Sequence, residues 1–116
     1  MPFLSVRTNA VLDESAVAPL LKDCSRLVAN LLGKPESYVM TTFDRVVGMT
    51  MAGSVGPACF LEVRSLGKMT SSQTKALSDV LCKVVSDHTG VVSERIYLNF
   101  IEFSGSMWGY DGGTFC

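Results

Sequence analysis

The chain has 116 residues, a net charge of −1 and a hydrophobic fraction of 47%, which suits one domain over residues 1–116 with a single core. The near-neutral charge argues against nucleic acid as a partner, because binding phosphates requires a basic face. The sequence contains neither an 18-residue apolar run for membrane insertion nor a signal-peptide pattern at its start.

The first predicted element is a strand over residues 3–8, and Pro2 directly precedes it. If Met1 is removed, Pro2 begins the chain as a secondary amine. Burial in an apolar cleft would lower the pKa of that amine by disfavouring its charged form. The amine could then act as a general base at neutral pH. The alternative interpretation is that Pro2 is simply compatible with the start of a strand.

A helix is predicted after Asp13, a candidate N-cap, and it is expected to stop at Gly33. Its apolar residues fall on one face, which is expected to lie on the sheet: Leu20, Leu21, Cys24, Leu27, Val28, Leu31 and Leu32. Residues 38–43 are rich in β-branched and aromatic side chains and predict a second strand. Residues 44–56 contain three glycines and predict a hairpin or a loop.

A third strand is predicted over residues 58–66, and a second helix follows Thr70, which forms a capping-box pattern with Gln73. The inner face of this helix is predicted to carry Leu77, Val80, Leu81, Val84, Val85 and His88, of which His88 is interpreted as structural. Gly90 ends the helix, and residues 95–103 form the fourth strand. The tail, residues 104–115, places aromatic residues among glycines and is expected to lie along a neighbour and line a pocket.

The sequence repeats itself internally. Residues 3–7 (FLSVR) match residues 60–64 (FLEVR) at four of five positions, and the same spacing places Gly33 on Gly90. The repeat, about 3–43 and 60–100, predicts an α/β (α+β) fold in which two pseudo-symmetric β-α-β units share one four-stranded sheet, with both helices on one face. The strands carry apolar residues on both faces, so a closed ring of subunits is expected to bury the open face.

The four cysteines, Cys24, Cys59, Cys82 and Cys116, form no C-x-x-C motif and have no metal-ligand spacing with the single histidine. No metal site is therefore predicted. Cys24 and Cys82 lie in helical patterns and are expected to be buried thiols. This use of cysteine favours folding in a reduced, cytoplasmic environment.

Several short blocks together carry a family resemblance. They are Met1-Pro2 before a strand, Thr8-Asn9, residues 33–40 (GKPESYVM), 65–68 (SLGK), 95–99 (RIYLN) and 108–115 (WGYDGGTF). In this order, and with the internal repeat, the sequence resembles the macrophage migration inhibitory factor and D-dopachrome tautomerase family of the tautomerase superfamily. The resemblance covers essentially the whole chain.

The resemblance implies a homotrimer with an active site at each subunit interface. It implies a cofactor-independent isomerase of the phenylpyruvate tautomerase or L-dopachrome isomerase type, acting on a small aromatic 2-keto acid with Pro2 as the base. The alternative is a cytokine-like signalling protein that binds a protein receptor and retains only vestigial tautomerase activity. Localisation is expected to be cytoplasmic, with secretion without a signal peptide left open.

The resemblance also implies roles for individual residues. Lys34 matches a lysine that meets the substrate carboxylate, and Leu66 matches a position whose backbone contacts the ligand. Tyr97 and Asn99 match a tyrosine and an asparagine, the asparagine coming from the neighbouring subunit. The matching aromatic pocket residues are Tyr38, Trp108, Tyr110 and Phe115.

Two positions depart from the pattern of many relatives. Arg64 stands where many have histidine, and it either adds a second anion contact or pairs with Glu62 or another acid. Cys59 lacks a C-x-x-C partner, which argues against thiol-disulfide oxidoreductase activity.

Overall fold

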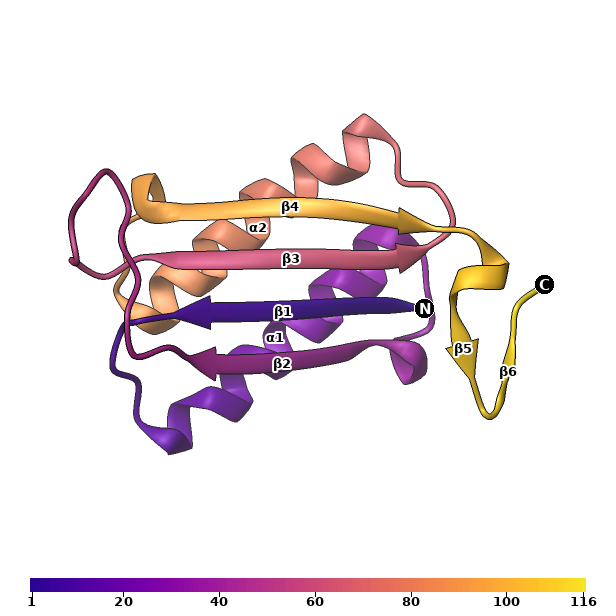
Figure 1. Cartoon of the computed structure of the whole chain (residues 1–116), viewed down its shortest axis with the longest axis horizontal. Helices are drawn as coiled ribbons and strands as arrows, with labels where there is room; N and C mark the ends of the chain where they lie inside the picture. The colour runs from indigo at the N-terminus through magenta and orange to yellow at the C-terminus, as the bar shows by residue number, and fades with distance from the viewer.

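The computed structural model describes residues 1–116, and it consists of a four-stranded sheet backed by two long helices (Figure 1). The main elements are β1 (Pro2–Thr8), α1 (Glu14–Leu32), β2 (Met40–Arg45), β3 (Cys59–Leu66), α2 (Ser71–Thr89) and β4 (Ile96–Phe103). The short elements are the 3-10 turns η1 (Glu36–Tyr38), η2 (Ser93–Arg95) and η3 (Gly105–Met107), and the strands β5 (Gly109–Tyr110) and β6 (Gly113–Thr114).

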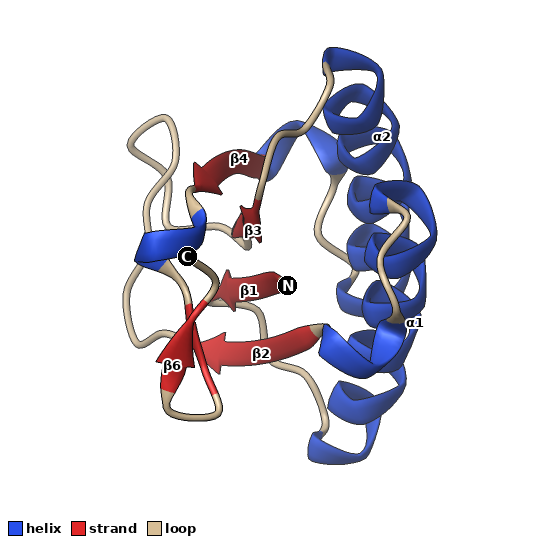
Figure 2. Cartoon of the chain, turned by 90° about the vertical axis from the view of Figure 1, so that its right-hand side faces the viewer, coloured by secondary structure: helices blue, strands red, loops and turns tan.

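The sheet has the order β2-β1-β3-β4, with parallel pairs at both edges and an antiparallel pair in the centre. Each half of the chain therefore forms one β-α-β unit, as the internal repeat predicts. Figure 2 shows both helices on one side of the sheet, while η3 and β6 lie on the other side. The predicted fold class is confirmed.

The hydrophobic core fills the space between the sheet and the helices. Its members include Leu4 and Val6 of β1, Leu61 and Val63 of β3, and residues from the inner faces of both helices, among them Leu20, Val28, Leu77, Leu81 and Val85. The prediction of buried thiols holds for Cys24 but is wrong for Cys82. The Cys82 side chain is only partly buried, because it lies in an open groove between α2 and β4, 3.8 Å from the Ser93 carbonyl oxygen.

The helix boundaries follow from short local signals. Gly33 and Gly90 both adopt positive φ angles, 63° and 77°, at the ends of α1 and α2, a conformation that favours glycine. At the start of α2, Thr70 accepts a hydrogen bond from the Gln73 backbone, and the Gln73 side chain accepts one from the Thr70 backbone. Asp13 occupies the N-cap position of α1, but its side chain makes no capping hydrogen bond.

Three strands begin later than their residue composition predicts: β3 starts at Cys59, one residue late, and β2 and β4 each start after a 3-10 turn. Tyr38, predicted to start the second strand, belongs to η1, where its N–H donates to the Pro35 carbonyl at 3.1 Å. Arg95, predicted to start the fourth, ends η2, and its N–H donates to the Val92 carbonyl at 2.9 Å. In both halves of the chain a single turn of 3-10 helix precedes the strand, so the same difference from the predicted strand start occurs at equivalent positions of the internal repeat.

Residues 46–58 form a loop at the end of the sheet opposite the N-terminus (Figure 1), with one small bridge between Met51 and Ser54. The Arg95 guanidinium holds this loop by donating to four backbone carbonyls at 2.8–3.2 Å: Met51, Ser54, Gly56 and Pro57. Asn9 adds a hydrogen bond to the Val55 carbonyl at 3.1 Å and accepts one from the Ala58 N–H at 2.9 Å.

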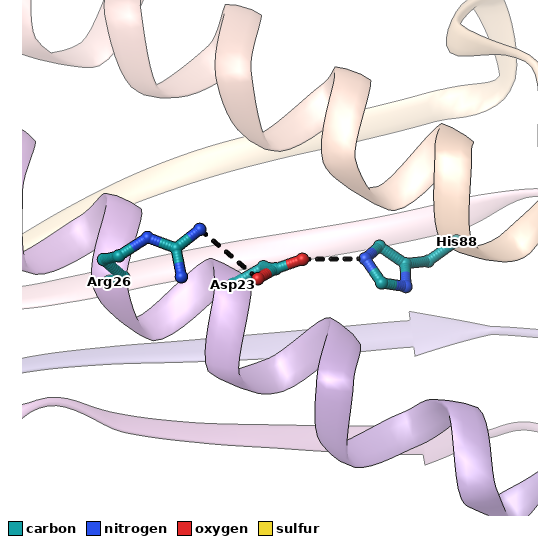
Figure 3. Close-up of polar contacts among 3 residues, drawn as sticks. All are labelled: Asp23, Arg26 and His88. Carbon is teal, nitrogen blue, oxygen red and sulfur yellow. Dashed lines mark hydrogen bonds and ion pairs between the residues drawn. The ribbon is translucent and has the colours of Figure 1, made fainter.

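His88 links the two helices through a contact with Asp23 of α1. Its Nε2 lies 3.0 Å from Oδ2 of Asp23, which also pairs with Arg26 at 3.3 Å (Figure 3). The hydrogen bond from His88 is the largest cause that lowers the pKa of the Asp23 carboxyl. This arrangement gives His88 a structural contact between α1 and α2.

We expect His88→Ala to raise the pKa of Asp23 and to lower the melting temperature at neutral pH. A carboxyl whose pKa is depressed by folding contributes stability above its unfolded pKa, and that contribution is lost as pH falls through the folded pKa. The difference in melting temperature between wild type and variant should therefore narrow at acidic pH. NMR titration of Asp23 measures the shift, with Arg26→Ala as the control of smaller expected effect. An unchanged Asp23 pKa in His88→Ala would contradict this prediction.

Candidate functional site

A cavity of about 540 Å³ lies at the end of the sheet where β1 begins. Pro2 is fully buried and lines it, next to Phe3 on the same strand. The segment from η1 into β2 contributes Tyr38 and Met40, β3 contributes Arg64, and the end of β4 and the tail contribute the remaining wall. The first residue of the sheet is thus a base candidate enclosed by residues from five parts of the chain.

The tail forms an aromatic wall over this cavity. The rings of Tyr38 and Tyr110 meet edge to face at 5.7 Å, and Phe115 stacks on Tyr110 at 6.2 Å. Trp108 packs edge to face on Phe103 at 5.5 Å. Such pairs add stabilisation beyond their buried area, so the wall is held in place by its own ring contacts.

A close backbone approach fixes the tail on its own subunit. The Phe115 N–H donates to the Gly105 carbonyl at 3.0 Å. A Cβ at Gly105 would lie 2.5 Å from the Phe115 carbonyl oxygen, so no other residue fits without displacing the backbone. The tail was expected to lie along a neighbour and line a pocket, and in this chain it folds back as the β5–β6 hairpin beside the N-terminus (Figures 1 and 2).

The contacts of Met1 indicate the chemical environment of the adjacent Pro2. The Met1 carbonyl accepts a hydrogen bond from the Leu66 N–H at 3.3 Å. The pKa of the Met1 amine is lowered, first by burial and second by the positive charge of Lys34. Lys34 is half-buried and does not line the cavity itself, but its charge acts on the amine at the cavity mouth.

Arg64 forms the ion pair with Glu62 that its sequence position left open as one alternative, and it also lies in the cavity wall. It lines the cavity, and its Nη2 also lies 3.5 Å from Oε2 of Glu62. Glu62 is flanked on its other side by Arg7, at 3.8 Å. The ion pair therefore holds Arg64 at the cavity wall without removing it from the cavity.

Tyr97 and Asn99 do not join the other candidates within one chain. In the register of the sheet, Pro2 pairs with Ser65, whereas Tyr97 pairs with Phe60, five residues earlier on β3 and roughly 16 Å away along the strand. Tyr97 lines a second cavity of about 350 Å³ beside the loop of residues 46–58. Both side chains are exposed, which leaves them free to contact a second subunit.

The structure adds cavity residues that the sequence patterns did not single out: Phe3, Met40, Phe103 and Met107. Phe3 and Met40 are neighbours in the β1–β2 register, so their shared position depends on strand pairing. Phe103 is the last residue of β4 and would have been found from the pattern of a strand leading into an aromatic tail. Met107 closes the η3 turn and has no signal of its own in the sequence.

Cys59 lies outside this cavity, in the wall of the second one. No three His, Cys, Asp or Glu side chains lie together, and neither long helix is apolar enough to cross a membrane. Cys59 is buried, and burial is the largest cause that raises the pKa of its thiol.

Comparison with known proteins gives one consistent result. The family described as Macrophage migration inhibitory factor (MIF) matches residues 1–116. A curated homologue of that factor from Trichuris trichiura is 37% identical over 99% of this chain and 100% of its own length. The solved structure of the Toxoplasma gondii factor has a TM-score of 0.94 at 34% identity, covering 97% of this chain and 99% of that one. A Prochlorococcus marinus homologue has a TM-score of 0.91 at 34% identity, with 98% and 99% covered.

Proposed function

This chain belongs to the macrophage migration inhibitory factor family, in the tautomerase superfamily, and we propose that it is a cofactor-independent keto–enol tautomerase. Membership supports an isomerase of the tautomerase kind. We infer that the substrate is a small aromatic 2-keto acid of the phenylpyruvate type. The observation that carries the proposal is Pro2, fully buried at the start of β1 and lining a cavity with an aromatic wall.

In the proposed mechanism Pro2 is the first residue of the mature protein. Its neutral amine takes a proton from the carbon beside the keto group, and the electron pair moves onto the keto oxygen. The protonated amine then returns the proton to that oxygen, which completes the enol and restores the neutral amine. With Met1 present, burial and the charge of Lys34 lower the pKa of the Met1 amine. We propose that the same two causes act on the amine of Pro2, which is fully buried in the same place, once Met1 is removed. A lowered pKa keeps the amine neutral, and therefore basic, near pH 7.

The substrate acid is assigned to Lys34 and to the Leu66 backbone. In the chain with Met1 present, the Leu66 N–H is occupied by the Met1 carbonyl oxygen. Removal of Met1 frees this donor beside the amine, where a substrate oxygen can accept from it. The aromatic side chains Tyr38, Trp108 and Tyr110 would pack on the substrate ring and exclude water.

We propose that the complete site forms in a homotrimer, with Tyr97 and Asn99 supplied by the neighbouring subunit. The exposure of both side chains supports this, Tyr97 near the far end of β4 and Asn99 in its middle, as do the two free edges of the sheet at β2 and β4. Light scattering at micromolar concentration should give three times the chain mass of 12.5 kDa. A monomer mass would contradict both the trimer and the shared site.

Shared sites also predict complementation between two inactive variants. A trimer of Tyr97→Ala subunits should be impaired, because no subunit supplies Tyr97 to its neighbour's site. A trimer of subunits that retain Met1 should be inactive, because none of its sites has the base. Mixed trimers would contain some sites that combine an intact Pro2 with an intact Tyr97, so activity should return on mixing. If mixing restored nothing although hybrid trimers form, the site would lie within one subunit.

The direct test of the proposed function is turnover of phenylpyruvate by protein whose N-terminus is verified as Pro2 by mass spectrometry. The rise in enol absorbance should depend on the concentration of this protein and saturate with substrate. Absence of turnover for both phenylpyruvate and L-dopachrome methyl ester would overturn the assignment.

A further inference from the structure

Arg64 is an arginine whose hydrogen-bonding capacity is almost unused. A guanidinium has five N–H donors, yet the only polar contact of this one is the 3.5 Å ion pair with Glu62. Its Nε is enclosed by protein atoms and has no acceptor. Arg95, in contrast, donates to four backbone carbonyls. An enclosed donor without an acceptor carries a desolvation cost, so the resting position of Arg64 is not fully satisfied.

The charges around Arg64 leave a positive excess. Glu62 is the one carboxylate between two guanidiniums, those of Arg7 and Arg64, so this cluster carries a net charge of about +1. Glu62 is itself 9% exposed and cannot turn away to other partners. Arg64 is the member of the cluster that lines the cavity, and Arg7 is not. The unneutralised charge of the cluster is therefore presented to the cavity through Arg64.

A second positive group acts on the same cavity from another direction. Lys34 follows α1, and its charge is felt at the amine beside the cavity mouth. A substrate with a single carboxylate can satisfy one of these two cations and leaves the other without an anion. Aromatic side chains, among them Tyr38 and Trp108, line the same cavity as Arg64.

We propose that the cavity is specific for an aromatic 2-keto acid that carries a second anionic group, with one anion bound at Lys34 and the other at Arg64. This inference rests on the proposed function for its keto acid chemistry. The anion contact at Lys34 belongs to that proposed function, whereas the preference for a second anion depends on the position of Arg64 in the cavity wall and on its unused donors. Arg64 is then a specificity-determining residue, and Glu62 holds its guanidinium at the wall.

The test measures binding and needs no catalysis. Trp108 is the only tryptophan of the chain and lines the cavity, so its fluorescence reports occupancy. The probes are phenylacetate, with one carboxylate, and 4-carboxyphenylacetate, with two. Protein beginning at Pro2 should bind the dianion about tenfold more tightly, as expected for one added charge-assisted contact at a partly exposed site.

Three variants separate a specific contact from a general field. Arg64→Gln should remove most of the preference for the dianion, and Arg64→Lys should retain part of it, because the charge remains without the guanidinium fork. Arg7→Gln is the matched control, because Arg7 carries the same charge and pairs with the same Glu62 carboxylate but does not line the cavity. It should leave the preference for the dianion intact. Melting curves of each variant verify that it is folded.

Equal affinity of the wild type for the two probes would overturn the inference, as would an equal loss of preference in Arg7→Gln and Arg64→Gln. These outcomes are distinct from a failure of the proposed function. If the protein prefers the dianion but turns over no keto acid, the inference of a second anion site stands and the tautomerase assignment fails. If the protein turns over phenylpyruvate but binds the two probes equally well, the tautomerase assignment stands and the inference of a second anion site fails.

Discussion

Protein that retains Met1 should show no tautomerase activity above background, whereas the same chain beginning at Pro2 should be active. Two physical reasons lead to this result. The nitrogen of Pro2 after Met1 is an amide without basicity, and Met1 itself forms part of the cavity wall beside Pro2. General base catalysis typically contributes a factor of about 10²–10⁴, so the difference should be easily measured with phenylpyruvate.

Pro2→Gly keeps a terminal amine but removes the proline ring, so it separates the need for an amine from the need for the rigid, packed ring. Processed Pro2→Gly protein still begins with an amine, so it should keep some activity while kcat/KM falls strongly. The amine loses the rigidity of the proline ring and its packing at the start of β1, where Pro2 is fully buried. Equal rates with and without Met1 would show that the proline amine is not the base, and a receptor-binding role would then become the leading hypothesis.

Lys34→Ala should raise KM by roughly 10- to 150-fold with a smaller change in kcat. A charge-assisted hydrogen bond contributes about 1.5–3 kcal/mol, and about 1.4 kcal/mol corresponds to a factor of ten. The lower part of the range is expected, because Lys34 is only half-buried. If the contact is equally strong in the ground and transition states, its loss falls on KM.

Two controls test whether this effect belongs to the substrate carboxylate. A methyl ester of the substrate lacks that charge and should be far less sensitive to Lys34→Ala. Lys68→Ala removes an equal charge from a loop beside the same end of the sheet, where Lys68 is 90% exposed and pairs with Glu102 at 3.6 Å. It should leave KM unchanged. A loss in Lys34→Ala that was as large for the ester as for the acid would contradict the role of Lys34.

Local and repeated patterns in the sequence predict most of this fold. The match between residues 3–7 and 60–64 predicts two equal units, and Gly33 and Gly90 mark equivalent helix ends. The alternation of apolar residues on the strands and their helical spacing then place the core between the two layers. Two of the errors, at Tyr38 and Arg95, lie where a single 3-10 turn delays a strand, because aromatic and long side chains suit a strand equally well.

The candidate site was less predictable, because it depends on strand register and on the path of the tail. The contact of Arg64 with Glu62, and of Glu62 with Arg7, requires that β1 and β3 pair in one particular alignment. The ring pairs of Trp108 with Phe103 and of Tyr110 with Tyr38 require the tail to fold back. Tyr97 lies near the far end of β4 and Asn99 in its middle, and the proposed role of both at Pro2 requires an arrangement of several chains.

The central claim, that the Pro2 amine is the base, is tested most directly by titrating that nitrogen. In protein labelled with ¹⁵N-proline and beginning at Pro2, only this one of the four proline nitrogens titrates, since the others are amides. Its pKa should lie below that of the same amine in a short peptide beginning Pro-Phe-Leu, and it should rise in Lys34→Ala. Because the neutral amine is the active form, kcat/KM should increase with pH through that same pKa. An amine pKa equal to the peptide value, or a kcat/KM profile that does not follow it, would contradict the account.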